Sequence, residues 1–361
     1  MIGNKFYSLK KIDKLKAKYN IIFGERSNGK TYACLYRILE NYCKSGTQGA
    51  YLRRWREDFI GKRGSVLFDA LVKNGVVEKL THGAYNTIYY YNSRWYLSLV
   101  NDKGERLNDT NPFCFGFALS AMEHDKSTSY PDITTIVFDE FLTRSGYITD
   151  EFVLFANTLS TIIRNRDNVT IYMLGNTVNK YCPYFGEMGL KHIKDMEQGD
   201  IDTYKYANGL TVAVEYCKPF AQGKKSDVYF GFENPKLNMI TGGTWEFDIY
   251  PKCPKGYDRH DILFTYFIEW DGELYQCEII KQGQLNYTFI HKKTTPIKND
   301  DVDLIYSTEY SPKPNYSRNI IKPRNLLERR IAEYFKFENV FYQDNETGDA
   351  IYNYLTWCAN G

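Results

Sequence analysis

The residues with the clearest chemical potential lie in one short stretch, from Gly24 to Thr31. This stretch, GERSNGKT, fits the pattern G-x-x-x-x-G-K-[ST], in which backbone N–H groups cradle phosphates, the lysine reaches the β- and γ-phosphates and the hydroxyl ligates Mg²⁺. An apolar run precedes it and a helix-like segment follows, which is the context that a nucleotide site requires. A glycine loop without a ligand is the alternative. We predict that ATP and Mg²⁺ bind at Gly24, Glu25, Arg26, Ser27, Asn28, Gly29, Lys30, Thr31 and Tyr32.

An acidic pair, Asp139-Glu140, follows the apolar run of residues 134–138. Such a β-branched and aromatic run is typical of a buried parallel strand, and open α/β sheets bind ligands at the carboxyl ends of their strands. Asp139 would hold the metal together with Thr31, and Glu140 would be the general base that polarises the attacking water. The alternative is that both carboxylates only cap the following helix.

Two further polar residues admit two interpretations each. Asn176 follows the apolar run 169–174 and would be either a γ-phosphate sensor or a turn residue after a strand. The helix-like stretch 150–163 ends in Arg164-Asn165-Arg166-Asp167, which is either a solvated helix end or, in a ring of identical subunits, the source of a guanidinium for the neighbour's site.

The elements that position these residues follow from the alternation of strand and helix patterns. We predict an α/β fold with a largely parallel sheet covered on both faces in residues 1–204, a linker subdomain in 205–243, and a smaller α+β domain in 244–361. A hairpin about Asp271-Gly272, a third strand at 285–290 and a helix capped by Asn325 make that last domain a small antiparallel sheet followed by helices. The turn explains Asp271, which with Glu269 resembles a metal pair.

Composition limits the class of protein. The chain has 361 residues, 43% hydrophobic and 25% charged, and a net charge of +2, so two domains are expected. Its eight cysteines show no zinc-ligand spacing, which favours a reducing compartment without a structural metal. No membrane span or signal peptide is evident, and a cytosolic location is expected.

Basic residues gather locally despite the small net charge. Residues 51–63 carry five basic and two acidic side chains, residues 311–337 carry seven and two, and residues 223–225 form a basic turn. Such segments either follow a phosphate backbone or form solvated faces. The candidates for DNA contact are Arg56, Lys62, Arg63, Lys224 and Lys225.

With these residues in place, the chain resembles the DNA-packaging ATPases (encapsidation proteins, terminase-like motors) of small short-tailed Salasvirus-type bacteriophages. The matching motifs keep their order over about the first 185 residues, and the C-terminal half is similar only in outline. They are residues 22–26, 51–54, 126–131, 136–141, 164–166, and Asn176 with 183–185. Arg26, two residues into the loop, is part of the family's variant and a candidate contact to phosphate or to a neighbouring subunit.

The resemblance implies an ATP-driven translocase that threads double-stranded DNA into a preformed capsid through its portal. It implies a homopentameric ring of P-loop NTPases of the additional-strand, catalytic-glutamate type, working in the host cytoplasm and transiently docked on the prohead. Arg164 would act in trans as an arginine finger, and Lys126 would be a second trans-acting cation. Arg56 would be a basic residue near the lumen of the ring. The last domain would be a vestigial RNase H-type nuclease for docking to DNA or capsid.

Some alternatives stay open after this comparison. A packaging RNA as a further partner is left undecided by the sequence. Another ring ATPase acting on DNA, such as a helicase or a partitioning pump, or a nucleotide-switched assembly factor without translocation, would carry the same loop and acidic pair.

Overall fold

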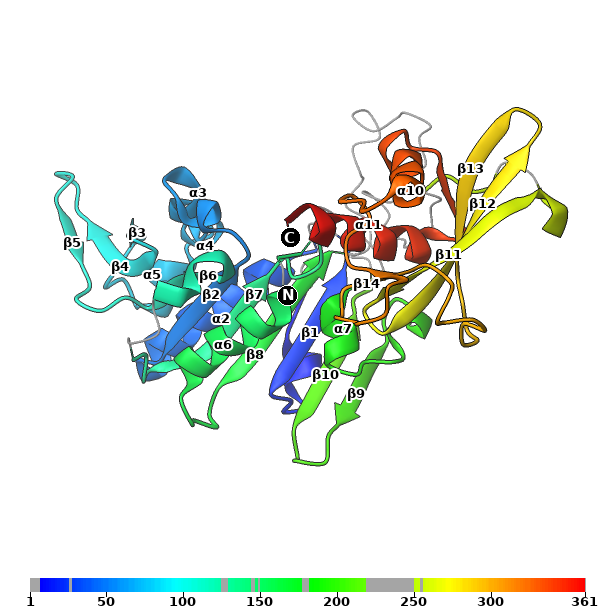
Figure 1. Cartoon of the computed structure of the whole chain (residues 1–361). Helices are drawn as coiled ribbons and strands as arrows, with labels where there is room; N and C mark the ends of the chain where they lie inside the picture. Colours follow the sequence, from blue (N-terminus) through cyan, green and yellow to red (C-terminus); the bar gives the residue numbers. More distant parts are fainter. Residues whose placement is uncertain are drawn as a thin grey trace, which may run out of the picture. The chain divides into compact units, whose positions relative to one another are not determined.

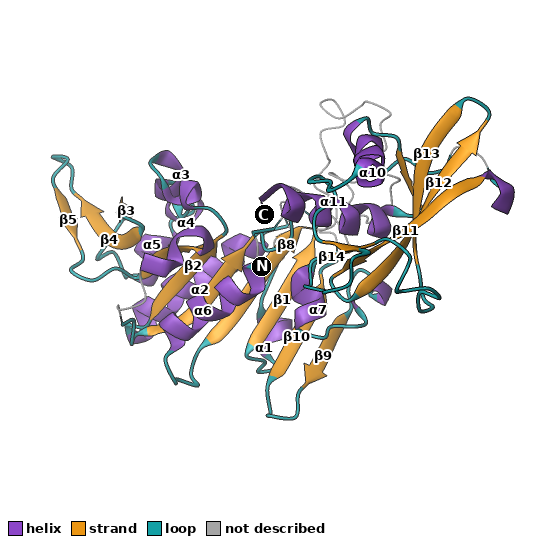
Figure 2. Cartoon of the chain, in the orientation of Figure 1, coloured by secondary structure: helices purple, strands orange, loops and turns teal. Residues whose placement is uncertain are grey.

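The computed structural model describes residues 7–25, 28–124, 129–143, 147–148, 150–176, 182–218, 250–253 and 256–360. By their contacts, these residues divide into two units. The first holds the described residues up to 143, 150–176 and 192–218, and the second holds 147–148, 182–191, 250–253 and 256–360. Figures 1 and 2 label the elements of both.

The elements of the first unit alternate between strands and helices. Its strands are β1 (Tyr19–Gly24), β2 (Gln48–Arg53), β3 (Thr87–Tyr91), β4 (Arg94–Val100), β5 (Arg106–Asn108), β6 (Cys114–Ala118), β7 (Ile133–Asp139), β8 (Thr170–Asn176), β9 (Ile201–Lys205) and β10 (Thr211–Tyr216). Its helices are α1 (Lys10–Asp13), α2 (Lys30–Ser45), α3 (Lys62–Ser65), α4 (Asp69–Lys73), α5 (Val76–Leu80) and α6 (Glu151–Ile163), with 3₁₀ turns η1 (Arg56–Phe59), η2 (Leu119–His124) and η3 (Ile193–Asp195).

The described strands of the first unit form one ten-stranded sheet, in the order β3-β4-β6-β2-β7-β8-β1-β10-β9 with β5 on β4. The six strands from β6 to β10 in this order are mutually parallel, and antiparallel strands flank them on both sides. The predicted largely parallel sheet is therefore confirmed. Strand β8 lies between β1 and β7, so one strand separates the predicted glycine loop from the acidic pair.

The two faces of this sheet are covered by different helices (Figure 1). Neighbouring residues of a strand point to opposite faces. Val137 belongs to the core that α2 supplies with Leu35 and Ile38, whereas the ring of Phe138 stacks on Phe155 of α6 at 5.2 Å. Strand β7 is thus buried on both faces, which explains its continuous apolar run.

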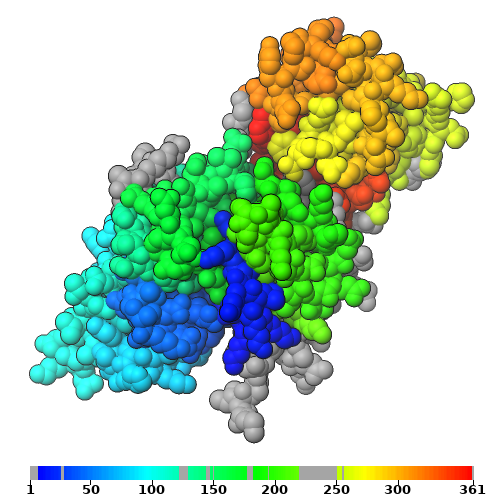
Figure 3. Space-filling model, turned by 90° about the horizontal axis from the view of Figure 1, so that it is seen from below, coloured from blue at the N-terminus to red at the C-terminus, as the bar shows by residue number. Residues whose placement is uncertain are grey.

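Residues 205–243 are predicted to form a linker subdomain, but the described part of this stretch belongs to the first sheet. Residues 211–216 pair in parallel with β1, and β9 pairs antiparallel with β10. Val212, Ala213 and Val214 are fully buried, so this apolar run extends the first sheet instead of linking two domains. The N-terminal segment (dark blue in Figure 3) lies beside β10, where the hydroxyl of Tyr7 donates to Glu215. Residues 219–243 lie outside the described residues.

The second unit contains a six-stranded mixed sheet among its described residues, in the order β15-β14-β11-β12-β13-β16. Its elements are α7 (Pro183–Glu187), η4 (Arg259–Asp261), β11 (Ile262–Trp270), β12 (Glu273–Gln282), β13 (Leu285–Lys292), β14 (Ile305–Ser307), β15 (Tyr316–Ser317), α10 (Leu326–Lys336), β16 (Val340–Tyr342) and α11 (Asn345–Asn360). The antiparallel prediction holds for β11, β12 and β13 but is wrong for the other three strands, which pair in parallel. Strands of two or three residues carry no readable period.

Local signals in this unit are confirmed. Asp271 and Gly272 adopt left-handed φ angles of 53° and 73° in the turn between β11 and β12, so Asp271 is accounted for by the turn. Asn325 caps α10 by accepting a hydrogen bond from the backbone N–H of Glu328 at 2.9 Å. Among the described residues, none of the helices is long and apolar enough to cross a membrane.

Candidate nucleotide site

The carboxyl ends of four parallel strands bring the predicted site together. Gly24 at the end of β1 is in register with Asn176 at the end of β8, and Asp139 ends β7 one strand further along. Strand β2, next to β7, ends at Arg53. The strand order therefore places the glycine loop, the acidic pair, the amide and two consecutive arginines at one edge of the sheet.

The glycine loop ends in a buried lysine with only neutral partners. Lys30, the first residue of α2, donates from Nζ to the backbone oxygens of Glu25 at 2.7 Å and Gly24 at 3.4 Å, and to Oδ1 of Asn28 at 3.2 Å. Burial lowers its pKa, and no carboxylate of the described residues lies within ion-pairing distance of the ammonium. A buried cation of this kind fits an anionic ligand such as a phosphate.

Backbone conformation at the two loop glycines requires glycine. Gly29 has φ 92° directly before α2, and Gly24 has φ 155°. A Cβ atom at Gly24 would approach Cβ of Cys217 to 3.0 Å. Tyr32 follows in the first turn of α2, where its hydroxyl accepts a hydrogen bond from Asn74 at 3.3 Å.

The predicted metal ligands contact each other. The hydroxyl of Thr31 donates to Oδ2 of Asp139 at 2.9 Å, and the hydroxyl of Tyr51 donates to the same oxygen at 2.7 Å. Burial raises the pKa of Asp139 above its ordinary value. A hydroxyl and a carboxylate oxygen side by side, next to the loop, form a donor set that suits Mg²⁺. Tyr51 was indistinguishable from core aromatics in the sequence, because it lies inside the apolar run of β2.

Glu140 projects from a strained position beside the metal ligands. Its φ of 58° is left-handed, which is uncommon for a non-glycine residue, and its side chain is 55% exposed. Its carboxylate accepts from Nη2 of Arg53 at 2.7 Å, and Nε of Arg53 donates to Asp58 in η1 at 3.1 Å. Arg53 thus connects Glu140 to the segment that follows β2.

The backbone of Glu140 is held by the next arginine. Arg54 is buried and donates to both carboxylate oxygens of Glu151, at 2.6 and 2.8 Å. The same guanidinium donates to the backbone oxygen of Glu140 at 3.1 Å and to that of Phe141 at 2.9 Å. We call this set of contacts the Arg54 clamp: it joins the end of β2, the turn after β7 and the first residue of α6.

The two arginines after α6 have different environments. Arg166 donates to the backbone oxygens of Tyr130, Pro131 and Ile133, at the start of β7, as well as to the last turn of α6. Arg164 is exposed and ends α6 with a left-handed φ of 39°. Because α6 begins at the Arg54 clamp and ends beside the start of β7, Arg164 lies at the opposite edge of the sheet from its own P-loop.

The remaining predicted residues are either exposed or not described. Arg56, Lys62 and Arg63 are exposed on η1 and α3. The other predicted residues, Arg26, Ser27, Lys126, Lys224 and Lys225, lie outside the described residues. The sequence pointed to Arg53 and Arg54 only as part of the basic segment 51–63 and of the matching motif 51–54, and it gave no partner for either.

This geometry can be compared with known proteins. The model of the podovirus DNA encapsidation protein (Gp16) family matches residues 1–198, more than half of the chain. The chain belongs to this family.

The chain matches curated relatives over about half of their length. The DNA packaging protein of Bacillus phage B103 is 29% identical over 175 residues, covering 47% of this chain and 48% of the relative. That of Bacillus phage phi29 is 28% identical over 183 residues, covering 50% and 49%. A solved structure of the bacteriophage Phi-29 viral genome packaging motor assembly is similar in fold, with a TM-score of 0.59 at 19% identity, and covers 97% of this chain and 98% of the other.

Proposed function

We propose that this encapsidation protein is an ATP-hydrolysing motor that moves double-stranded DNA into a preformed capsid as part of a homomeric ring. The observation that carries the proposal is the meeting of Lys30, Thr31, Asp139 and Glu140 at one sheet edge, in a chain whose curated relatives are DNA packaging proteins. Proteins that only switch with nucleotide do not require a carboxylate poised beyond the metal ligand.

The residues present fit ATP with Mg²⁺. Lys30 would exchange its neutral loop partners for the β- and γ-phosphates, and Thr31 with Asp139 would hold the metal. When bound, Mg²⁺ neutralises charge on the phosphates and orients them. Asn176 would donate its amide to the γ-phosphate, a role that its register with Gly24 across β1 and β8 supports. The strand between β1 and β7 supports assignment to the additional-strand, catalytic-glutamate class.

Glu140 serves as the general base in this proposal, and Arg53 controls it. Nη2 of Arg53 occupies one carboxylate oxygen of Glu140, so Glu140 would have to leave Arg53 before that oxygen can contact the attacking water. Because Arg53 also binds Asp58, a movement of Arg53 away from Glu140 would be transmitted to η1, which carries Arg56. This links base activation to the segment that we assign to DNA contact.

Arg164 would act on the neighbouring subunit. Helix α6 has 13 residues, about 20 Å of length, between the Arg54 clamp and Arg164, which removes Arg164 from its own P-loop. Its exposure supports insertion into the site of an adjacent copy. The role of Lys126 as a second trans-acting cation, and the count of five subunits, stay proposals drawn from family resemblance.

DNA contacts are assigned to the exposed basic residues after β2. Arg56, Lys62 and Arg63 lie on short elements next to the Arg53–Asp58 pair, and they would grip phosphates without reading bases. Lys224 and Lys225 stay proposed on sequence alone.

The second unit would be a docking module of RNase H-like topology. Its meander β11-β12-β13, followed by β14 and β15 added in parallel beside β11, supports this assignment. We assign it a non-catalytic role in contact with DNA or with the capsid portal, and the motor would work in the host cytoplasm while docked on the prohead. A packaging RNA is a candidate for the same docking role.

The test is ATP turnover with and without linear double-stranded DNA over a range of salt concentrations. A DNA-stimulated rate that falls steeply with salt and is indifferent to DNA sequence is expected, because the contacts are to phosphates. Turnover unaffected by DNA in assembled rings would point instead to a nucleotide-switched assembly factor. Strand separation on a forked duplex without capsids would point to a helicase.

A further inference from the structure

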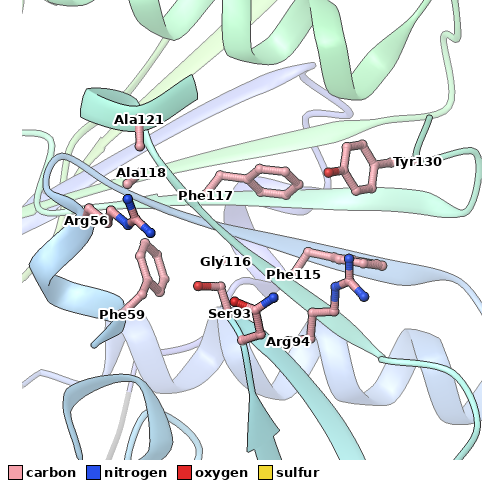
Figure 4. A pocket seen from close by; sticks show the side chains of 11 residues that line it. Arg56, Phe59, Ser93, Arg94, Phe115, Gly116, Phe117, Ala118, Ala121 and Tyr130 are labelled. Atoms are coloured by element: carbon pink, nitrogen blue, oxygen red, sulfur yellow. The ribbon is translucent and has the colours of Figure 1, made fainter. Parts of the chain in front are cut away.

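A hollow of about 350 Å³ lies in the first unit and shares no lining residue with the glycine loop (Figure 4). Four parts of the chain line it: η1, the turn between β3 and β4, strand β6 with η2, and Tyr130 just before β7. Arg56 and Arg94 contribute guanidiniums, and Phe115, Phe117 and Tyr130 contribute rings.

The hollow exists because the sheet is incomplete at this point. Strand β4 pairs with β6 through only two residue pairs, Arg94 with Phe115 and Trp95 with Cys114. Residues 92–93, directly before β4, turn toward β3, so β4 does not extend along the rest of β6. Gly116 lets the ring of Phe59 pack directly on β6, since a Cβ atom there would meet that ring at 2.6 Å. The hollow therefore lies where β4 no longer pairs with β6.

The charge of the hollow is positive. Arg56 and Arg94 are both exposed, and neither makes an ion pair with a described residue, whereas Arg53 and Arg54 nearby are both neutralised by carboxylates. The guanidinium of Arg94 lies 5.8 Å from the ring centre of Phe115. No carboxylate is among the lining residues, so an anion is the ligand that this charge favours.

The wall of the hollow is aromatic. Tyr130 packs edge-to-face against Phe115 at 5.3 Å and against Phe117 at 5.0 Å, so the three rings form one apolar block. Figure 4 shows this block on one side and Phe59 with Arg56 on the other. A planar apolar group next to an anionic group would satisfy both features.

We propose that this hollow is a second nucleotide subsite, which takes one nucleotide unit with its base against the aromatic block and its phosphate between Arg56 and Arg94. Proteins that bind single-stranded nucleic acid usually stack the bases on aromatic side chains and bind the phosphates with guanidinium groups. Bases in a duplex are paired and stacked, so the unit comes either from an unpaired end or gap of the nucleic acid or from a free nucleotide. The proposed motor needs only duplex backbone contacts, and this subsite goes beyond them.

The test is equilibrium binding by the full chain without ATP, in a Lys30→Ala background that removes nucleotide binding at the glycine loop. A fluorescein-labelled single-stranded 12-mer and its duplex are the two probes, and nucleoside monophosphates are the competitors. Displacement by the monophosphates identifies free nucleotide as a ligand, and resistance to them identifies the strand as its source. The measurement involves neither ATP nor turnover. A negative binding result would therefore refute the subsite and leave the motor proposal intact, and a failed turnover test would leave the subsite intact.

Two variants and one control make the test specific. Arg94→Gln removes a guanidinium, and Ala121→Phe fills the hollow from η2. Arg106→Gln is the control, because Arg106 is also exposed and also lies over a ring, that of Tyr89 at 5.2 Å, but does not line the hollow.

We expect Ala121→Phe, which excludes the stacked base, and Arg94→Gln, which removes a charged phosphate contact, each to weaken single-strand binding by roughly tenfold or more. Duplex binding should change no more than it does in Arg106→Gln. The proposal is overturned when Arg94→Gln and Arg106→Gln have equal effects on the single strand. It is equally overturned when Ala121→Phe, shown to be folded by circular dichroism, binds the single strand as tightly as its parent.

Discussion

The Arg54 clamp gives a prediction that separates stability from catalysis. The side chains of Arg54 and Glu151 are only 6% and 1% exposed, so replacing Glu151 by Leu would remove the carboxylate that a buried guanidinium contacts at 2.6 and 2.8 Å. Removing one partner of a buried pair typically costs about 3–5 kcal/mol in the free energy of unfolding. A domain with a total of about 5–15 kcal/mol would lose a large share of its stability.

The double variant Arg54→Met/Glu151→Leu should behave differently. An apolar pair of similar volume in place of a buried ion pair is commonly neutral or stabilising, so the free energy of unfolding should rise well above that of Glu151→Leu. Activity should stay low, because the backbone oxygens of Glu140 and Phe141 would still lack the donor that holds them at 3.1 and 2.9 Å. We expect a reduced kcat with KM for ATP nearly unchanged, since the glycine loop is untouched.

Urea unfolding followed by circular dichroism and steady-state ATP turnover are the two assays. An exposed pair on α2 supplies the control: Lys44→Gln removes the contact with Glu40 and should cost less than about 0.5 kcal/mol. Recovery of kcat together with stability in the double variant would refute the positioning argument. A loss of under about 1 kcal/mol in Glu151→Leu would refute the energetic one.

Three further outcomes follow from the site and from the second unit. Glu140→Gln should bind ATP normally while kcat falls by about 10²–10⁴-fold, as measured by nucleotide titration and phosphate release; an unchanged rate per bound nucleotide contradicts the base assignment. Arg164→Ala subunits mixed into rings with the parent chain should lower turnover more steeply than their share of the mixture, whereas a proportional decline argues against action in trans. The carboxylate of Glu278, 3.8 Å from Nε2, raises the pKa of His291, so this pair should stabilise the second unit below the ordinary histidine pKa and lose that effect as pH rises through the raised value. Urea midpoints from pH 5.5 to 8.5 should therefore fall with pH more in the parent than in His291→Gln.

Motifs, turns and caps were predictable from the sequence, but the hydrogen-bond partners of the site residues were not. The glycine loop, the strand before Asp139, the turn at Asp271-Gly272 and the cap at Asn325 depend on neighbours within a few residues. The sequence expresses such short-range rules directly.

Long-range pairings at the site could not be inferred from the sequence. Arg54 and Glu151 are 97 positions apart, and Arg53 and Glu140 are 87 apart, so only the strand order brings them together. Arg164 and Arg166 were equivalent in the sequence, and only the backbone oxygens of Tyr130, Pro131 and Ile133 distinguish the structural arginine from the exposed one. The place of β10 in the first sheet was missed because its parallel pairing joins residues 212–216 to residues 19–23, which are far apart in the sequence.

Helix α6 has a consequence for the timing of a ring. Its first residue is fixed to the turn that carries Glu140, and its last turn is fixed through Arg166 to the start of β7, with Arg164 exposed at this second end. A helix that is held at both ends moves as a rigid body. A conformational change in the turn at Glu140 would therefore displace Arg164. If Arg164 enters the adjacent site, one subunit would determine when the next can hydrolyse ATP. The order of hydrolysis around the ring would then depend on this helix.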